Sequence, residues 1–445
     1  MKEKIRIVVL LLCLLVMYLV LNFIDPLLLW DENVYLANAR SHISISNFKE
    51  DFRFPLLEYI IALIWFITGE SIFVAKLAMI LFSLGSIYVF YLIAKEYFSD
   101  MNAFLATILF SLSPLMIYWG FRVYTDNVAL FFMSVSYYLI IKGFDNIEFL
   151  VGIIFALSFL TKFSFGLFGI AVVIHFLFKK RLKKILMFSA GFILALVPWM
   201  IYNYIHYSNI IWDIILQWSV VQIYTHVEPI SKHFINASYI GGILLLFIPF
   251  GIINLIKEKK NYVIMFIYSG LNIFYYFSIV PLKEIRYYFS IISFLYIIMF
   301  SGILFASNKI RSLTIKRIMY IIIIFSIMSL FVFQSMQIIR RGYCEKQGAT
   351  LQAINHVGSQ KDEYTAVISN IWPYFGYYNN VYAYSLWTKE LNTQLKRYNI
   401  DYVIYHNKEG LNFNKTLLDI NQDLYLRKEI NGICNDNIYI FQVIK

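Results

Sequence analysis

Two neighbouring acids, Asp31 and Glu32, stand shortly after the first long apolar segment of the chain, in the sequence LLLWDENVY. A carboxylate held beside a hydroxyl group can accept its proton while the oxygen attacks an electrophile. The same residues suit a helix start, because Asp is a common N-cap and acids are favoured in the first helical turn. Their spacing alone leaves a general-base role and a structural role open.

Basic side chains recur at the edges of later apolar segments. Arg53 directly precedes the stretch 55–68, Lys162 interrupts another stretch, and Lys283 and Arg286 lie in the sequence KEIRY. Lys and Arg bind phosphate through charge-assisted hydrogen bonds, and the planar Arg guanidinium can form two such bonds in parallel. Each residue could instead anchor a helix to lipid headgroups.

Two further groups of polar residues are ambiguous. Asp126 ends the short segment RVYTD, where a helix cap is the simplest explanation; together with Lys162 it is also a possible substrate-binding residue. His226, Glu228 and His233 form the pattern HxExxxxH, which is not a recognised spacing of metal ligands. We therefore expect neither a metal nor a cofactor.

The elements that must position these residues are predicted to be membrane spans. Of the 445 residues, 60% are apolar and 15% are charged, whereas soluble proteins are about 45–50% apolar and about 25% charged. A helix needs roughly 20 mostly apolar residues to cross the hydrocarbon. The sequence predicts eleven spans, with a break at Thr161-Lys162: 7–24, 72–94, 102–119, 127–141, the two halves of 149–178, 185–201, 237–256, 262–280, 287–306 and 318–339.

The basic residues indicate which loops face the cytoplasm. With the N-terminus inside, the inner segments hold 17 Lys and Arg against 6 Asp and Glu, which accounts for the whole net charge of +11. This asymmetry is the positive-inside pattern, so the charge argues against a nucleic-acid partner. The run KKRLKK at 179–184 is its strongest marker. We expect a multi-pass protein of the cell membrane, with residues 341–445 on the extracytoplasmic side.

One segment has two possible placements. The stretch 55–68 is short for a span and contains Glu58, so we expect an interfacial helix on the outer side. In the alternative topology it crosses the membrane and 149–178 crosses only once, which would move Asp126 to the inner side. The stretch 5–24 lacks a small-residue cleavage site and is therefore taken as a span rather than a signal peptide.

Residues 341–445 have the pattern of a small α/β domain. The runs TAVISN (365–370), VYAYS (381–385), DYVIYH (401–406) and IYIFQVI (438–444) are typical of strands, and the polar stretch 386–398 between them is compatible with a helix. We therefore divide the chain into a membrane domain, 1–340, with a first outer loop at 25–71, and an extracytoplasmic domain, 341–445. Within that loop the segment from Trp30 to about Ser41 is predicted to be a short helix.

Cys344 and Cys434 both fall in this extracytoplasmic domain. A disulfide and two unpaired thiols are equally compatible with their spacing.

In order along the chain stand an Asp-Glu pair, a basic residue with Pro-Leu before an interfacial helix, Thr-Asp, Leu-Thr-Lys and Glu-x-Arg-Tyr. This order resembles the GT-C glycosyltransferases, particularly the protein O-mannosyltransferase and lipid A aminoarabinose transferase group, over about residues 25–300. The sequence departs from that group at Phe54-Pro55, where Pro-Pro or His-Pro-Pro is usual, and at Arg53, where Lys or His is usual. These departures leave the sugar unidentified.

The resemblance implies a GT-C-like helical fold and transfer of a sugar from a polyprenyl-phosphate donor to an acceptor hydroxyl. Asp31 matches the general base and Glu32 the second acid, while Arg53 and Arg286, with Lys283 nearby, match residues that hold the donor phosphate. A single base and a good leaving group imply inversion at the sugar, unlike a retaining glycosidase. The acceptor can be a glycan, a lipid or a protein, and near members of the family need no metal.

Two other functions remain as alternatives. A transporter would carry ionisable residues or broken helices near the bilayer midplane in repeated halves, whereas here the charges gather at the predicted outer face. A scaffold for assembly of cell-envelope glycans or lipids would keep the extracytoplasmic domain but would not need Asp31, Arg53 and Arg286 together.

Overall fold

The computed structural model describes residues 2–444 except 45, 51–52, 145, 224–228, 230, 259–261, 281–283, 347, 363, 387–390, 408–414, 420, 433 and 435. The chain forms two compact units. The membrane unit comprises Met1–Leu19, Phe52–Leu57 and Leu77–Met336. The sheet unit comprises Val20–Asp51, Glu58–Lys76 and Gln337–Lys445.

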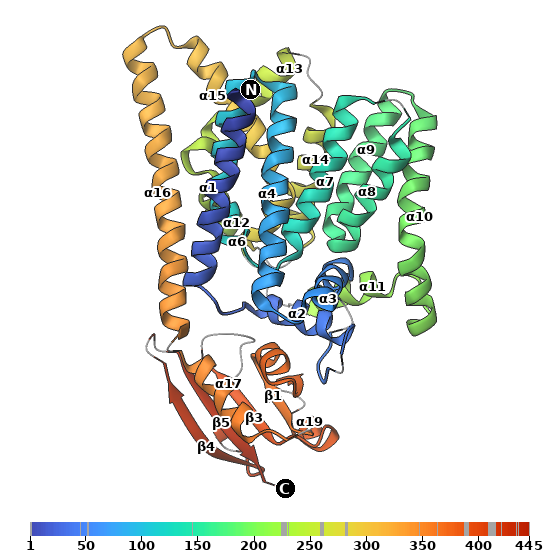
Figure 1. Cartoon of the computed structure of the whole chain (residues 1–445), viewed down its shortest axis with the longest axis vertical. Coiled ribbons are helices and arrows are strands. Elements are labelled where there is room, and N and C mark those ends of the chain that lie inside the picture. The colour runs from blue at the N-terminus through green and yellow to red at the C-terminus, as the bar shows by residue number, and fades with distance from the viewer. Residues whose placement is uncertain are drawn as a thin grey trace. The chain divides into compact units, whose positions relative to one another are not determined.

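Helices that lie wholly or mainly in the membrane unit form the larger body (Figure 1). They are α1 (Lys2–Ile24), α4 (Ile72–Tyr97), α5 (Asp100–Ser111), α6 (Pro114–Trp119), α7 (Thr125–Lys142), α8 (Glu148–Thr161), η1 (Phe163–Gly166), α9 (Leu167–Phe178), α10 (Leu182–Tyr207), α11 (Trp212–Ile223), α12 (Ser231–Gly241), η2 (Gly242–Phe247), α13 (Ile248–Lys257), α14 (Val263–Ser278), η3 (Ile285–Ser290), α15 (Ile292–Lys309) and α16 (Leu313–Lys346).

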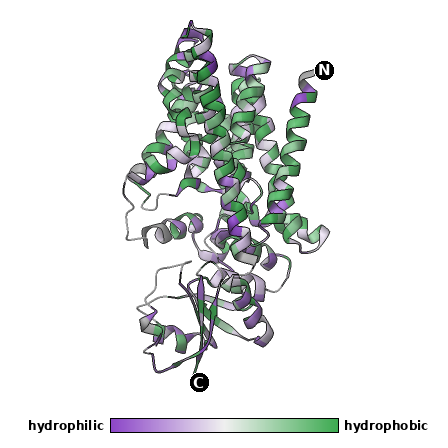
Figure 2. Ribbon diagram, turned by 90° about the vertical axis from the view of Figure 1, so that its left-hand side faces the viewer, coloured by the Kyte–Doolittle hydropathy of each residue, from purple (hydrophilic) through white to green (hydrophobic). Residues whose placement is uncertain are grey.

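The predicted spans fall on these helices, although 102–119, 237–256 and 287–306 each cover more than one helical segment. In the described part of the chain, six helical segments are long and apolar enough to cross a membrane, and several others are apolar but shorter. Most of the residues in these helices are hydrophobic (Figure 2). The predicted fold class, a polytopic helical membrane protein with a small C-terminal sheet region, is confirmed. The number of eleven spans stays a prediction.

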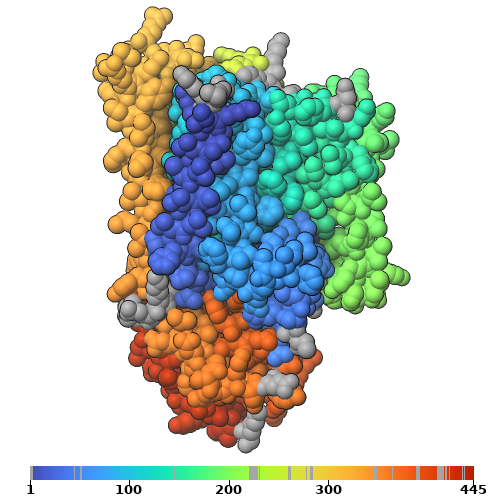
Figure 3. Space-filling model, in the orientation of Figure 1, coloured from blue at the N-terminus to red at the C-terminus, as the bar shows by residue number. Residues whose placement is uncertain are grey.

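Small residues allow the membrane helices to pack closely. Helix α8 lies along α7 and α10, and α13 lies along α15; the first three belong to a continuous packed surface in Figure 3. A Cβ atom on Gly152 of α8 would lie 2.1 Å from the carbonyl oxygen of Phe188 on α10, and one on Gly302 would lie 2.0 Å from that of Phe247. Close backbone approach at small residues is a usual basis of helix association in membranes, so larger side chains here would separate these helices.

The segment 149–178 folds back on itself at Lys162. This residue has extended backbone angles (φ −154°, ψ 112°) and separates α8 from η1 and α9. Phe155 and Phe168, placed almost symmetrically about the break, have ring centroids 5.4 Å apart. A single continuous helix would hold them roughly 20 Å apart. The predicted break at Thr161-Lys162 is therefore confirmed, whereas the number of times that 149–178 crosses the membrane stays a prediction.

The sheet unit is built on a five-stranded mixed sheet of order β2-β1-β3-β5-β4. Its strands are β1 (Ala366–Ser369), β2 (Tyr382–Ser385), β3 (Tyr402–His406), β4 (Leu424–Asn431) and β5 (Asn437–Val443). Strand β1 pairs in parallel with β2 and β3, whereas β5 pairs antiparallel with β3 and β4. Four strands match the predicted ones, and β4 was missed.

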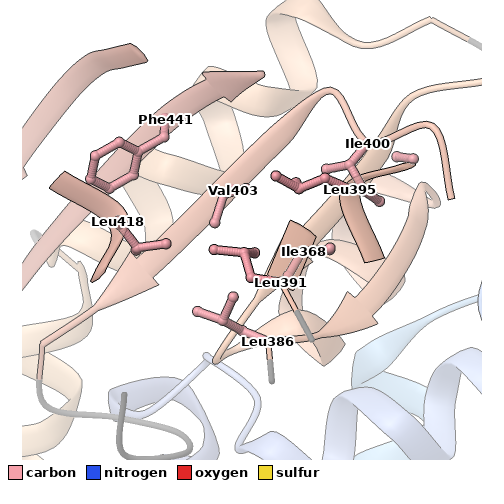
Figure 4. Packing of buried hydrophobic residues seen from close by; sticks show 9 residues of the cluster. Ile368, Leu386, Leu391, Leu395, Ile400, Val403, Leu418 and Phe441 are labelled. Carbon is pink, nitrogen blue, oxygen red and sulfur yellow. The ribbon is translucent and has the colours of Figure 1, made fainter. Parts of the chain in front are cut away.

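Short helices accompany the sheet and cover an apolar core. They are α17 (Ala349–Gln360), α18 (Trp372–Tyr374), η4 (Phe375–Asn379), α19 (Leu391–Arg397) and α20 (Thr416–Asp419). Leu391 and Leu395 of α19 pack with Val403 and Phe441 of the sheet (Figure 4). The disulfide left open by the sequence is present, because Cys344 at the end of α16 is bonded to Cys434.

Most of the first outer loop, residues 25–51 and 58–71, belongs to the same compact unit as the C-terminal domain. The loop contains α2 (Trp30–Ser41), with the predicted bounds, and leads into α3 (Leu56–Thr68). The Arg40 guanidinium donates to the Tyr377 carbonyl oxygen at 2.7 Å. The side-chain amide of Asn47 donates to the Asn380 carbonyl oxygen at 3.0 Å. The predicted domain boundary at 340/341 stays a prediction, but the loop makes extensive contacts with residues beyond it.

Candidate active site

The membrane unit contains a buried ion pair between two residues singled out by the sequence. Asp126 is the second residue of α7 and is only 2% exposed. Lys162, at the break after α8, places its Nζ 2.6 Å from Asp126 Oδ1. The break in the helix is what frees Lys162 to turn toward the start of α7. The predicted role of Asp126 as a helix cap is wrong, because the N-cap of α7 is Tyr124. Asp126 instead neutralises a largely buried cation.

Aromatic rings connect this ion pair to the segment that carries Arg286. The Lys162 Nζ lies 5.7 Å from the ring centroid of Tyr287, which stacks on Tyr276 at 4.8 Å. The Arg286 guanidinium carbon lies 5.4 Å from the ring centroid of Tyr124, two residues before Asp126. Cations over aromatic faces gain electrostatic attraction. The structure therefore brings Asp126, Lys162 and Arg286 into one cluster.

Both cations of the cluster also have carboxylate partners. Arg286 forms an ion pair with Glu284 of the same segment, and Lys162 forms the pair with Asp126. Arg has five N–H donors and Lys three, so each can keep its carboxylate and still bind an anion. The motif KEIRY drew attention to Arg286 but gave no sign of these pairings.

Arg53 lies next to a residue that is anchored close to the Lys162 break. The Phe54 ring lies 5.7 Å from that of Phe159 and 5.9 Å from that of Phe163, which flank Lys162 in sequence. Phe54 thus anchors the chain directly after Arg53. Lys283, the remaining predicted phosphate-binding residue, lies outside the described residues.

Arg122 is a buried cation that sequence reasoning did not assign to the site. Its side chain is fully buried, its guanidinium carbon lies 4.5 Å from the Tyr118 ring centroid, and its Nε donates to the Tyr118 carbonyl oxygen at 2.9 Å. The sequence RVYTD signals only a polar turn. Nothing in it shows that the arginine is enclosed.

The predicted catalytic acids lie on α2 of the sheet unit. The helix begins at Trp30 with Leu29 as N-cap, so Asp31 occupies the first turn and is not the cap. The Leu29 N–H donates to Glu32 Oε2 at 2.7 Å, and Glu32 is fully buried. The structural role considered for the acidic pair therefore falls on Glu32. Asp31 is 8% exposed and sits where the helix dipole favours an ionised carboxylate.

A pair of indoles supports the start of α2. Trp30 and Trp372, from the first outer loop and the C-terminal domain, meet edge to face with centroids 4.5 Å apart. The Trp372 Nε1 donates to Glu50 Oε1 at 3.2 Å. Residues of the C-terminal domain thus fix the helix turn that carries Asp31.

Lys76 is a second buried cation whose role the sequence did not reveal. It is 1% exposed and donates to the carbonyl oxygens of Asp25 and Pro26, each at 3.3 Å. Arg341 Nη1 lies 3.5 Å from Asp25 Oδ2. These bonds hold the start of the loop that leads to Asp31.

The histidine pattern has only one member in the described part of the chain. His233 Nδ1 lies 3.0 Å from the Tyr288 hydroxyl oxygen. His226 and Glu228 lie outside the described residues. Among the residues that are described, no three His, Cys, Asp or Glu side chains gather as a metal site would require.

Comparison with known proteins identifies the fold. Residues 53–202 match the model of the dolichyl-phosphate-mannose-protein mannosyltransferase family. ArnT from Cupriavidus metallidurans bound to undecaprenyl phosphate aligns over 97% of both chains, with a TM-score of 0.71 and 12% identity. The alignment with the oligosaccharyltransferase of Archaeoglobus fulgidus in the apo form covers 89% of this chain and 69% of that protein's chain, with a TM-score of 0.56 and 11% identity. No curated protein matches the sequence.

The chain therefore has the GT-C fold, and the resemblance inferred from its sequence is confirmed. The matched family and the structural neighbours are glycosyltransferases, which is the predicted enzyme class. Multi-pass membrane localisation is likewise confirmed. The roles predicted for individual residues remain predictions.

Proposed function

We propose that the chain transfers a sugar from a polyprenyl-phosphate donor to an acceptor hydroxyl, with inversion, on the extracytoplasmic side of the membrane. The observation that carries this proposal is the cluster around Lys162 and Arg286 in the membrane unit. It joins cations and aromatic rings at helix ends, within a fold shared with an ArnT structure that contains undecaprenyl phosphate. Such a cluster suits a phosphate at headgroup depth.

In the proposed reaction Arg286 and Arg53 hold the donor phosphate, with Lys283 as a further candidate. The acceptor oxygen attacks the anomeric carbon, and its proton passes to the Asp31 carboxylate. The bond from that carbon to the phosphate oxygen breaks, and polyprenyl phosphate leaves with the bonding electrons. Glu32 keeps Asp31 in place by capping the turn, since it accepts the Leu29 N–H. Asp126 and Lys162 complete the substrate site.

Two observations support the proposed side of the membrane. The basic residues concentrate in the loops assigned to the cytoplasm. The Cys344–Cys434 disulfide lies in the C-terminal domain, and disulfides persist mainly in oxidising compartments. The acceptor is a hydroxyl of a glycan, a lipid or a protein.

The direct test supplies purified protein in lipid with polyprenyl-phosphate sugars and a panel of hydroxyl acceptors. We expect release of polyprenyl phosphate that depends on acceptor and occurs with inversion at the sugar. Arg286→Ala should lower the release, whereas Arg317→Ala, in a predicted inner loop, should not. Tight donor binding without release under any acceptor would contradict the transferase and favour a scaffold.

A further inference from the structure

A second charged site lies at the other end of the α8–α9 hairpin. A cavity of about 120 Å³ is lined there by the end of α7, the start of α8, the end of α9 and the turn into α10. Its charged lining residues among those described are Glu148, Lys179, Arg181 and Lys184. Helix α8 separates Glu148 from the Lys162 break by about 20 Å at 1.5 Å per residue. This basic cavity is therefore distinct from the site around Arg286.

Only some of the basic side chains in the run KKRLKK line the cavity. Lys179, Arg181 and Lys184 line the cavity, whereas Lys180 and Lys183 do not. The division arises in the turn, where Lys180 adopts a left-handed conformation (φ +55°) and the Arg181 N–H donates to the Phe176 carbonyl oxygen at 2.9 Å. Few residues other than Gly adopt this conformation. A basic run that served only to set the orientation of the protein in the membrane would not need three of its side chains to line one cavity.

Positive charge exceeds negative charge around the cavity. Lys184 forms an ion pair with Glu148, so three cations face one carboxylate among the described lining residues and a net charge of +2 remains. Burial lowers the pKa of Lys179, and the nearby charges of Arg181 and Lys184 lower it further. Cations held this close repel one another, and a bound anion would relieve that repulsion.

The rest of the lining is apolar. Leu139, Phe144 and Ile264 contribute to the wall, and the cavity lies at the ends of membrane helices. Free phosphate gains nothing from contact with an apolar wall. A phospholipid can place its phosphate against the basic residues and its acyl chains against the apolar ones. Basic pockets between membrane helices on the cytoplasmic side are known to bind anionic headgroups.

We propose that the basic cavity binds the phosphate group of an anionic phospholipid of the adjoining leaflet. Lys179 and Arg181 donate to the phosphate, Lys184 remains paired with Glu148 at its edge, and the acyl chains lie against the apolar wall. The site is independent of the proposed transferase reaction. It would make the stability of the α7–α10 region depend on the lipids around it.

The test compares matched pairs of charge-neutralised variants of the full chain in neutral detergent. One variant carries Lys179→Gln and Arg181→Gln, and its control carries Lys180→Gln and Lys183→Gln, which removes the same charge from the same run. Binding of short-chain phosphatidylglycerol, phosphatidylcholine and inorganic phosphate is measured by native mass spectrometry and by thermal shift. Melting temperatures without lipid verify that each variant is folded.

We expect the wild type and the control to bind phosphatidylglycerol in preference to phosphatidylcholine. The cavity variant should bind phosphatidylglycerol at least about tenfold more weakly, because it loses charge-assisted bonds. Equal weakening in both variants would overturn the proposal in favour of diffuse attraction to the basic run. Inorganic phosphate that binds the cavity as tightly as the lipid would overturn it in favour of a free-anion site.

Discussion

The two units of the molecule are put together in different ways. Most of the membrane unit is one continuous stretch, Leu77–Met336, whose helices pack on close sequence neighbours such as α7, α8 and α10. The sheet unit gathers three segments, Val20–Asp51, Glu58–Lys76 and Gln337–Lys445. Contacts between residues more than 300 positions apart, such as Arg40 with Tyr377, hold it together.

This difference separates the two halves of the proposed chemistry. The proposed base, Asp31, belongs to the sheet unit, whereas Arg53 and Arg286, the proposed phosphate-binding residues, belong to the membrane unit. The position and proton affinity of the Asp31 carboxylate should therefore respond to changes in the C-terminal domain. Donor binding should respond to changes around the Lys162 break. The following experiments test this separation.

The largest effect is expected for Asp31→Asn. If Asp31 is the general base, its loss should reduce the transfer rate about 10²–10⁴-fold, with little change in melting temperature because Leu29 and Glu32 cap the helix. The turnover rate at saturating donor is the measurement. Glu32→Gln is the control, because it alters the hydrogen bond from the Leu29 N–H that caps α2 and leaves Asp31 in place. Normal turnover in the Asp31→Asn variant would mean that Asp31 is not the base.

Removing one member of the buried Asp126–Lys162 pair should lower the stability of the membrane unit, in addition to any loss of transfer from the proposed substrate site. Asp126→Asn leaves Lys162 without its carboxylate, and Lys162→Met leaves Asp126 without its cation; each should cost about 3–5 kcal/mol of unfolding free energy. The double variant should recover much of that loss, as measured by thermal unfolding in detergent. A double variant that is stable yet inactive would assign the pair to substrate binding.

Loss of either phosphate-binding arginine should act on the donor. Each charge-assisted bond contributes about 1.5–3 kcal/mol, so Arg53→Ala or Arg286→Ala should lower kcat/KM for the donor about ten- to a hundredfold. Lys at either position keeps the charge but lacks the planar guanidinium, so the kcat/KM of a Lys variant should fall between those of the wild type and the Ala variant. Transfer is measured at several donor concentrations. Unchanged donor dependence in both folded Ala variants would place the phosphate elsewhere, with Lys162 and Lys283 next to test.

The smallest effect is expected for acid titration of Asp362 in the sheet unit. The hydrogen bond from the Thr365 hydroxyl, with backbone N–H donors, lowers the pKa of the Asp362 carboxyl. Its folded pKa lies below the ordinary 3.8, so the stabilisation is complete above that value and is lost as the pH falls through the folded pKa. Hydrogen exchange of β1 should show this loss, and Thr365→Val should reduce it, because the backbone N–H donor of Tyr364 remains. Thr365→Ser keeps the hydroxyl and should behave as wild type.

Local patterns in the sequence predicted the elements, and the structure agrees where the pattern was strong. The bounds of α2, the break at Lys162 and four strands follow from helix-start residues, a charge in an apolar run and β-branched runs. Strand β4, LYLRKEIN, was missed because most of its residues are exposed and it has no apolar face to recognise. Strand β4 lies at the edge of the sheet, where charged side chains hinder pairing with another chain.

Pairings between distant residues were beyond the reach of sequence patterns. The Asp126–Lys162 pair joins residues 36 positions apart, and nothing in either local segment specifies the other. The burial of Arg122 and Lys76, and the union of the first outer loop with the C-terminal domain, likewise depend on packing of the whole chain. The candidate residues could be selected from the sequence because charge in an apolar setting is costly, but their partners could not.

The disulfide has a consequence for how the protein is made. Cys344 and Cys434 are separated by 90 positions, and β1 to β4 lie between them. At synthesis rates of about 5–20 residues per second, roughly 5 to 20 seconds pass between the two cysteines. During that interval Cys344, at the end of α16, cannot form its native bond because Cys434 has not yet been synthesised. The native disulfide can therefore close only after all four of these strands have been synthesised.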